Sequence, residues 1–302
     1  MMKLPRFVFQ AGENLVEKDW GGYWIPELKG VAASGRIGES WEFSAYPSRP
    51  SEVLVWGRRV KFPELVAVAG QEILGALSEK YSSFPILVKL LDVRGKLSVQ
   101  VHPSDEVAEL FGETDPGKSE GWVALGEGKV YVGFKEDTCA DEIKEKPEKT
   151  PLKLNEFRAE LLDTFMIPAG TVHFAENVRL LEVSTNSNIT YRVFDFEGRE
   201  VQLERAIRAM RFSRSRESEV RGEKGMFEMA NFGLETIKVN GSAELSTEDA
   251  FNILFCVNGD VMLRSGGEKA RLRKGYSCLV PAVTGKYTIE GEQAIVIKIY
   301  AK

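Results

Sequence analysis

The sequence is poor in cysteine and has no long apolar run, and each shortage excludes a class of protein. No stretch approaches the roughly 20 apolar residues that cross a bilayer, so we expect no membrane partner and no spanning segment. The opening ten residues contain Pro5 and too little apolar length for a signal peptide. The three cysteines (Cys139, Cys256 and Cys278) are odd in number and lack paired spacing. That usage indicates a reducing compartment, with the cytoplasm as the default expectation.

An excess of positive charge is also missing. The net charge is −5, with acidic and basic residues interspersed, which argues against a nucleic-acid-binding face. The apolar fraction of 43% and charged fraction of 28% are typical of a globular protein. A chain of 302 residues is long enough for one large or two moderate domains.

Most of the chain reads as short strands separated by glycine, proline and polar turns. The predicted strands are 51–57, 96–102, 129–134, 161–168, 178–185, 189–196, 227–239, 250–265, 269–275, 276–282, 286–291 and 293–300. Apolar residues at three- and four-residue spacing predict helices over 63–80, 104–111 and 203–212. Many strands with few helices predict a mainly β barrel or sandwich with helical insertions.

A charged, apolar-poor segment at 213–225 predicts a boundary between two domains, 1–215 and 216–302. The two parts also resemble distant copies, since 167–174 can be aligned without gaps on 280–287. In this alignment Lys286 stands where His173 stands. Short matches also arise by chance, so the internal repeat is a hypothesis.

Only two histidines occur, and each lies in a pattern suited to a metal. In the strand 96–102, alternation puts Ser98, Gln100 and His102 on one face and the apolar residues on the other. Buried polar groups in such a row need partners, and a metal ion supplies one. The alternative is a hydrogen-bonded core histidine beside a solvated polar face.

The second histidine follows a turn, Pro168-Ala169-Gly170-Thr171-Val172-His173-Phe174-Ala175-Glu176-Asn177. Proline and glycine together reverse a chain tightly. The pattern resembles the second conserved motif of the cupin superfamily, which carries a metal-binding histidine into a β-barrel. The resemblance implies a cupin (jelly-roll) β-barrel with helical insertions, and the repeat implies a second, degenerate cupin-like β domain without metal ligands.

A third pattern, Gly117-Lys118-Ser119-Glu120-Gly121-Trp122, follows the Gln-Val-His-Pro strand. This order resembles type I mannose-6-phosphate isomerase, in its shorter bacterial and archaeal form. The resemblance extends over residues 19–212 through four further motifs, at 19–22, 38–42, 190–195 and 203–207.

The family resemblance implies a reaction and a set of site residues. The reaction is the interconversion of mannose 6-phosphate and fructose 6-phosphate through a cis-enediol. The metal ligands that carry over are Gln100, His102, Glu120 and His173. This nitrogen and oxygen set suits one zinc ion per chain, with other divalent metals as alternatives. The implied catalytic residues are Arg192, Lys118 and Glu182, and the implied substrate contacts are Ser98 and Glu42. The base stays open between Glu182, Lys118 and a water on the metal.

Glu182 and Arg192 are also expected to pair across a hairpin. If Asn186, Ser187 and Asn188 form its turn, the two charged residues lie opposite one another. The alternative interpretation is a surface ion pair with little energetic weight.

Other functions remain as alternatives. A cupin glucose-6-phosphate or bifunctional isomerase would share the metal site, and a non-catalytic cupin would bind a sugar phosphate without turnover. A metal-dependent oxygenase is disfavoured, because Gln100 stands where such cupins usually have histidine. Phe174 replaces a residue that is often small in the family, and the large helical insertion of longer members is missing. The sugar preference at C2 is therefore open, and we expect a monomer or homodimer.

Overall fold

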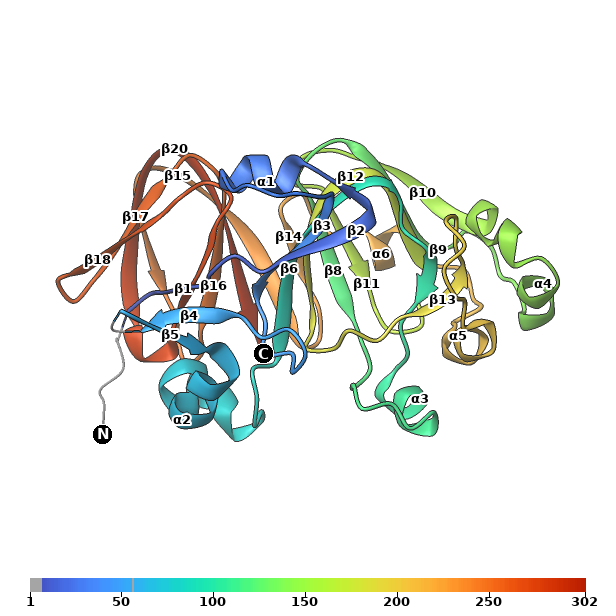
Figure 1. Ribbon diagram of the computed structural model, residues 1–302, viewed down its shortest axis with the longest axis horizontal. Coiled ribbons are helices and arrows are strands. Elements are labelled where there is room, and N and C mark those ends of the chain that lie inside the picture. The colour runs from blue at the N-terminus through green and yellow to red at the C-terminus, as the bar shows by residue number, and fades with distance from the viewer. Residues whose placement is uncertain (1–6, 56) are drawn as a thin grey trace.

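The computed structural model describes residues 7–55 and 57–302. Residues 1–6, within the opening segment, and Trp56, within a predicted strand, lie outside the described residues. Two large curled sheets form barrels that lie side by side (Figure 1). This confirms the prediction of a mainly β cupin architecture with a second β domain.

The first barrel is a ten-stranded sheet built from residues 15–194. Its strands are β2 (Leu15–Gly22), β3 (Ile37–Phe43), β6 (Ile86–Lys96), β7 (Val99–Val101), β8 (Glu120–Ala124), β9 (Gly128–Phe134), β10 (Leu154–Ala159), β11 (Thr164–Ile167), β12 (His173–Thr185) and β13 (Tyr191–Phe194). The central order is β10-β9-β12-β6-β3-β2. The long strand β12 also pairs with β7 and β8. These pairings close the barrel and bring segments that are distant in the sequence around one interior.

The second barrel is an eight-stranded sheet with the order β1-β19-β16-β20-β15-β14. Its strands are β1 (Phe9–Gln10), β14 (Met226–Glu228), β15 (Phe232–Ser246), β16 (Asn252–Asn258), β17 (Val261–Ser265), β18 (Glu268–Leu272), β19 (Ser277–Val280) and β20 (Lys286–Ala301). A separate ribbon joins β4 (Glu52–Val55) to β5 (Arg58–Lys61). Because β1 adds an N-terminal segment to the C-terminal sheet, the division at residues 215 and 216 stays a prediction.

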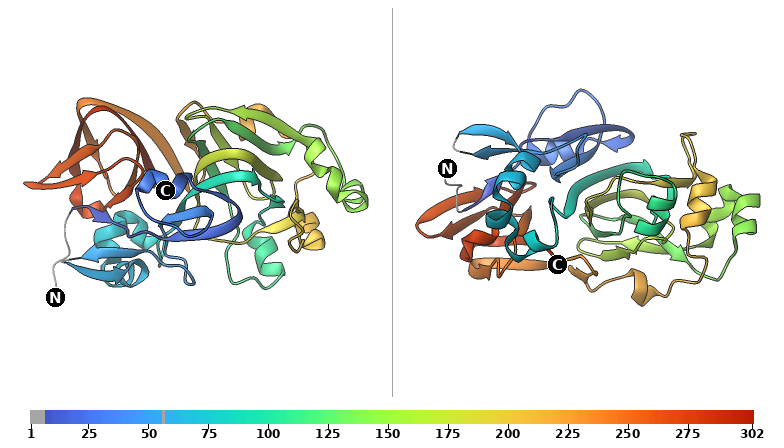
Figure 2. Two further views of the ribbon diagram at one scale, coloured as in Figure 1. Left: turned by 45° about the horizontal axis from the view of Figure 1, so that its top comes forward. Right: turned by 90° about the horizontal axis from the view of Figure 1, so that it is seen from below.

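Helices occupy the insertions between strands (Figure 2). They are α1 (Trp24–Lys29), α2 (Phe62–Leu74), η1 (Gly75–Glu79), α3 (Asp105–Leu110), α4 (Ala140–Glu145), η2 (Pro147–Lys153), α5 (Leu203–Ala209), α6 (Glu217–Val220) and η3 (Ala282–Thr284). Each of the three predicted helices is present. In the described part of the chain, no helix has both the length and the apolar character to cross a membrane.

The predicted helix over 63–80 changes character at Gly75. This glycine has a φ of 61°, and a Cβ there would lie 2.2 Å from the carbonyl oxygen of Asp249. Only a residue without a side chain allows this approach. α2 therefore stops at Leu74, and the 3₁₀ turn η1 rests against the second barrel.

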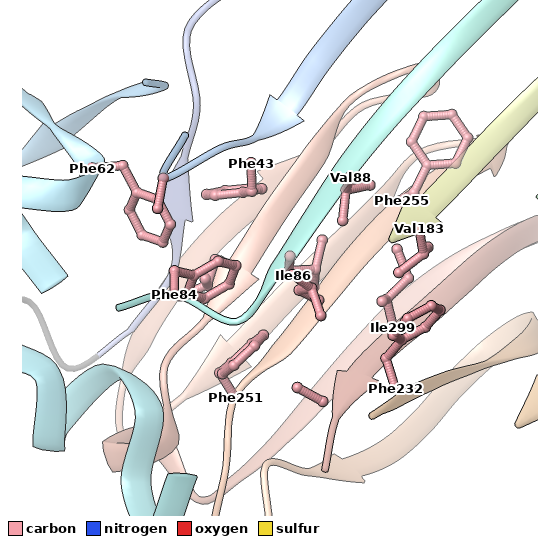
Figure 3. Packing of buried hydrophobic residues seen from close by; sticks show 14 of the residues in the cluster. Phe43, Phe62, Phe84, Ile86, Val88, Val183, Phe232, Phe251, Phe255 and Ile299 are labelled. Atoms are coloured by element: carbon pink, nitrogen blue, oxygen red, sulfur yellow. The ribbon is translucent and has the colours of Figure 1, made fainter. Parts of the chain in front are cut away.

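The two barrels share a hydrophobic core (Figure 3). Phe43 and Val88 of the first barrel belong to the same buried cluster as Phe255 and Ile299 of the second. A chain of aromatic rings spans the junction, with centroid distances of 5.5 Å for Phe43–Phe62, 4.7 Å for Phe62–Phe84 and 4.5 Å for Phe84–Phe251. A shared buried core of this kind resists relative movement of the two barrels.

The segment 213–225 does not behave as a free linker. It contains the short helix α6, and Val220 at the end of that helix is fully buried. Ser215 is also buried, and its backbone nitrogen donates to the carbonyl of Phe134. Most charged side chains of this segment are exposed, but its backbone packs on the first barrel.

The positions aligned in the hypothetical repeat occupy corresponding places in the two barrels. Ile167 ends β11 and His173 begins β12, while Val280 ends β19 and Lys286 begins β20. A turn links the two strands in each case. This correspondence supports the repeat, with Lys286 in the second barrel at the place of the histidine.

Candidate active site

The turn after β11 brings the two histidines together. Gly170 adopts a φ of 85°, and its backbone nitrogen donates to the carbonyl of His102 at 2.8 Å. His173 then begins β12 opposite Gln100 of β7. The imidazole centroids of His102 and His173 lie 4.8 Å apart. The turn thus joins two segments that are distant in the sequence.

The hydrogen bonds of the two imidazoles fix their protonation. His102 Nδ1 lies 2.7 Å from the carbonyl oxygen of Ile189, and His173 Nδ1 lies 2.8 Å from that of Thr171. A carbonyl only accepts, so each Nδ1 carries the proton and each Nε2 presents a lone pair. Burial and the nearby Lys118 lower the pKa of His102 to about 3, which keeps its ring neutral at pH 7.

Both Nε2 lone pairs face the carboxylate of Glu120. The distances are 3.2 Å from His102 Nε2 to Oε2 and 3.1 Å from His173 Nε2 to Oε1. Within the described residues, His102 Nε2 and both Glu120 oxygens are buried without a partner in hydrogen-bond geometry, although the Lys118 ammonium lies beside Oε2. Lone pairs facing one another without a proton need a cation between them. The three side chains form a site for a divalent metal ion, with all ligand atoms within 4.8 Å of one another.

Gln100 lies beside this group on the predicted polar face of its strand. Its amide Nε2 is 3.2 Å from His173 Nε2, and its Oε1 accepts from Ser98 Oγ at 3.2 Å. The neighbouring Val99 and Val101 are fully buried in the barrel core. The strand therefore alternates as expected, and a neutral amide adjoins the three candidate ligands.

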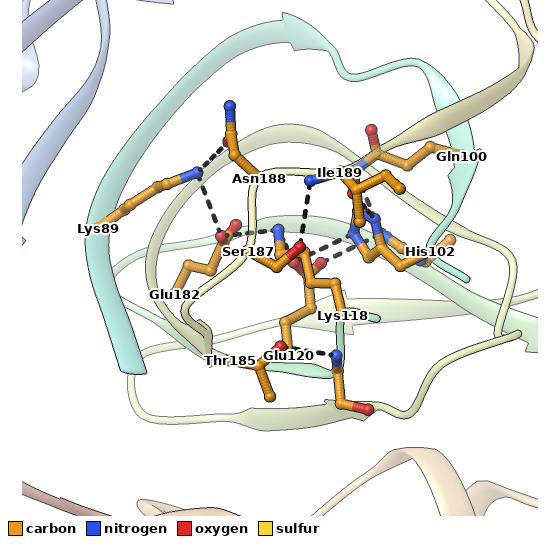
Figure 4. Close-up of polar contacts among 12 residues, drawn as sticks. Lys89, Gln100, His102, Lys118, Glu120, Glu182, Thr185, Ser187, Asn188 and Ile189 are labelled. Atoms are coloured by element: carbon orange, nitrogen blue, oxygen red, sulfur yellow. Dashed lines mark hydrogen bonds and ion pairs between the residues drawn. The ribbon is translucent and has the colours of Figure 1, made fainter. Parts of the chain in front are cut away.

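Lys118 neutralises the carboxylates next to the metal site (Figure 4). Its ammonium lies 2.5 Å from Glu120 Oε2 and 3.1 Å from Glu182 Oε1. Burial alone would lower the pKa of Lys118, but the two carboxylates outweigh burial and raise it above its usual value. Burial would likewise raise the pKa of Glu120, but Lys118, His102 and His173 together outweigh burial and hold that pKa well below the usual range. Lys118 is therefore a fixed positive charge.

A cavity of about 220 Å³ opens beside these residues. Its lining includes the predicted residues Ser98, Gln100, Lys118, Glu182 and Arg192. Four larger hollows, of about 490 to 660 Å³, contain none of the predicted site residues. The smaller, charged cavity is the candidate substrate site.

The cavity also contains residues that the sequence interpretation missed: Lys18, Trp20, Glu39, Lys89, Asn188, Thr190 and Arg199. Lys89 is buried, with its ammonium 3.0 Å from Asn188 Oδ1 and 3.7 Å from Glu182 Oε1. Its signal in the sequence is a single charged residue within the apolar run from Ile86 to Leu91. Burial lowers the pKa of Lys89, although Glu182 and Glu39 oppose this effect.

Glu42 lies elsewhere, contrary to the prediction that it contacts substrate. It is not among the cavity-lining residues of the described chain, and both of its carboxylate oxygens have partners. Glu39, on the opposite face of β3, lines the cavity instead and accepts from Trp41 Nε1 at 2.7 Å. Two residues separated by an odd number of positions point to opposite sides of a strand, and the cavity lies on the Glu39 side.

The predicted hairpin between Glu182 and Arg192 is wrong. Glu182 pairs with Lys89 and Trp122 in β6 and β8, whereas Arg192 pairs with Gln100 in β7. The two residues line the same cavity, but they reach it from separate strand pairs. Arg192 is half-buried and forms no ion pair with a described residue.

Two family models match the chain. The model of the phosphomannose isomerase type I catalytic domain matches residues 10–127, and that of the mannose-6-phosphate isomerase cupin domain matches residues 223–301. Mannose-6-phosphate isomerase ManA of Bacillus subtilis is 28% identical over 296 residues, which cover 91% of this chain and 93% of that protein.

Solved structures agree in fold over nearly the whole chain. A zinc-bound mannose 6-phosphate isomerase has a TM-score of 0.85 at 18% identity and covers 98% of this chain and 99% of its own. That likeness concerns the fold alone. A candidate mannosephosphate isomerase from Archaeoglobus fulgidus has a TM-score of 0.93 and 45% identity, covering 100% of both chains. With a relative this similar over its full length, the chain belongs to the type I mannose-6-phosphate isomerase family.

Proposed function

We propose that this protein is a metal-dependent aldose–ketose isomerase that interconverts mannose 6-phosphate and fructose 6-phosphate through a cis-enediol. The observation that carries the proposal is the convergence of two imidazole lone pairs on Glu120 beside a cavity lined by lysines, an arginine and carboxylates. A purely structural metal site would not need this charged cavity.

The proposed cofactor is one zinc ion per chain. His102, Glu120, His173 and the neutral amide of Gln100 would hold it. The set of two nitrogens and one carboxylate fits zinc, and the zinc-bound structure of the same fold supports this choice. A metal held by these residues would supply Lewis-acid polarisation of the substrate oxygens at C1 and C2.

The side chains around the cavity divide the remaining work. Lys89, with its lowered pKa, is our candidate for the group that moves the proton between C2 and C1. Glu182 lies 3.7 Å from the ammonium of Lys89 and holds it in place. Lys118 stays charged and stabilises negative charge that develops on the substrate oxygens. Ser98 lines the cavity near Gln100 and can donate a hydrogen bond to the sugar.

A coupled assay for the conversion of mannose 6-phosphate to fructose 6-phosphate tests the proposal. The assay is run on the purified protein, after chelation, and after zinc is restored, with glucose 6-phosphate measured in parallel. Activity on mannose 6-phosphate that disappears and returns supports the reaction and the metal requirement. No turnover by the metal-loaded protein would leave only a binding role, and preference for glucose 6-phosphate would identify the other isomerase.

Arg192→Ala is expected to lower kcat/KM by about a hundredfold while the metal content stays unchanged. The Arg192 guanidinium has no ion-pair partner among the described residues, and its Nε is buried without a hydrogen bond. It is therefore available to an anionic substrate. Steady-state kinetics and elemental analysis measure the two effects. Arg158→Ala, which changes an exposed arginine on β10, is the control, and equal kinetics for both variants would remove Arg192 from the site.

A further inference from the structure

A buried polar cluster joins the two barrels behind the cavity wall. Glu42 of β3 accepts from Ser277 of β19 at 2.9 Å and from Ser40 at 2.7 Å. Its Oε1 also lies 2.8 Å from the ammonium of Lys29, at the end of α1. Glu42, Ser277, Ser40 and Lys29 are all buried. We call these four residues the interbarrel cluster.

α1 strengthens the same connection. At its start, the backbone nitrogen of Trp24 donates to Asp92 of β6 at 2.8 Å. At its end, the carbonyl of Lys29 accepts from the hydroxyl of Tyr276 at 2.7 Å, and the Lys29 ammonium lies 4.6 Å from the Tyr276 ring centroid. Figure 1 shows α1 above the junction between the barrels. The helix is therefore fixed to both of them.

The other face of β3 forms part of the active-site wall. Trp41 Nε1 donates to Glu39 at 2.7 Å, and the ammonium of Lys89 lies 4.4 Å from the Trp41 ring. Glu39 also pairs with Lys18 at 3.1 Å. Glu39 and Trp41 lie on the face of β3 opposite Glu42, because side chains alternate along a strand. All three share one backbone, so a shift of β3 at Glu42 also moves Glu39 and Trp41.

Stability alone does not account for the interbarrel cluster. A buried ion pair pays for its desolvation, and apolar residues of similar size often stabilise a protein as well or better. The two barrels already share a large apolar core. The polar cluster adds directional interactions, and these hydrogen bonds fix the position of β3 more narrowly than apolar contacts do.

We propose that Ser277 and Glu42 are positioning residues for the isomerase reaction, through which the second barrel holds the Glu39–Trp41 wall of β3 against Lys89 and the substrate. The proposal rests on the proposed function for its effect on kinetics. It gives the second barrel, which lacks the metal ligands, a part in substrate binding.

Ser277→Ala is the primary test, because it removes one hydroxyl and leaves the Lys29–Glu42 pair in place. We expect KM for mannose 6-phosphate to rise roughly tenfold with the metal content unchanged. A purely structural defect would lower the folded fraction, and hence the apparent kcat, without raising KM. Ser277→Thr, which keeps a hydroxyl, is expected to have a KM close to that of the wild type. Ser265→Ala, which removes a partly exposed hydroxyl from the same barrel, is the matched control.

A spectroscopic measurement separates this proposal from the proposed function. In protein labelled with fluorinated tryptophan, Ser277→Ala is expected to shift the fluorine NMR signal of Trp41, assigned with Trp41→Phe. The signal of Trp122, inside the first barrel, should stay in place. An unchanged Trp41 signal, or an unchanged KM, in Ser277→Ala would overturn the proposal. If the wild type fails to turn over the sugar phosphate, the proposed function falls, and the Trp41 signal alone decides the positioning role.

Discussion

Replacing Glu120 with glutamine is expected to abolish metal binding and to lower kcat/KM by about a thousandfold or more. Glutamine keeps the shape of the side chain but removes the only negative charge among the four proposed ligands. It also leaves the Lys118 ammonium, now 2.5 Å from Glu120 Oε2, directly beside the metal position. A buried cation at that distance opposes a second cation strongly.

Elemental analysis and thermal unfolding with and without chelator measure the outcome. Wild-type protein should unfold at a lower temperature after chelation, because ligand binding to the native state stabilises it. Glu120→Gln should show no such dependence. Glu182→Gln is the matched control, since it removes the other carboxylate from Lys118 and leaves the proposed ligands unchanged. A full complement of metal in Glu120→Gln would contradict the assignment of Glu120 as a ligand.

Local sequence patterns indicated the two histidines, and the family resemblance added Glu120 and Gln100 as expected ligands. The alternation around His102 and the turn before His173 each depend on a few neighbouring residues. The closure of a cupin barrel brings the two histidines together. The structure places both histidines and Glu120 within reach of one ion.

The pairing of the strands could not be predicted from the sequence. β12 has 13 residues and pairs with four other strands, so the nearest strand in the sequence is not its partner at Glu182. β13 turns away to pair with β7, which puts Arg192 beside Gln100. Long-range packing of this kind decides the register, and a hairpin assumption based on loop length cannot represent it.

The side of β3 that faces substrate was also set by distant contacts. All seven residues of this strand are buried, so a division into a buried and an exposed face does not distinguish the glutamate that lines the cavity from the other one. The second barrel covers the Glu42 side through Ser277, and Lys89 of β6 lies on the Glu39 side. Both neighbours are far away in the sequence. The motif at 38–42 was recognised, but the choice within it needed the tertiary structure.

Lys89→Met is expected to lower kcat by about a thousandfold with the metal retained, because a general base contributes on the order of 10² to 10⁴ to such a rate. Methionine is apolar and of similar length, so it fills the buried position without an uncompensated charge. Lys89 has the properties that Lys118 lacks. Burial lowers its pKa, whereas the carboxylates of Glu120 and Glu182 raise that of Lys118.

The pH dependence of kcat/KM distinguishes Lys89 as a base from a role in binding alone. A base acts in its neutral form, and a lowered pKa gives Lys89 more of this form at neutral pH than an ordinary lysine has. The rate should therefore rise with pH through the pKa of Lys89 and level off above it. Residual activity of Lys89→Met should lack this rise. If the rise persists in the variant, the titrating group is another one, and Glu182, whose carboxylate lies 3.7 Å from the Lys89 ammonium, becomes the residue to replace next.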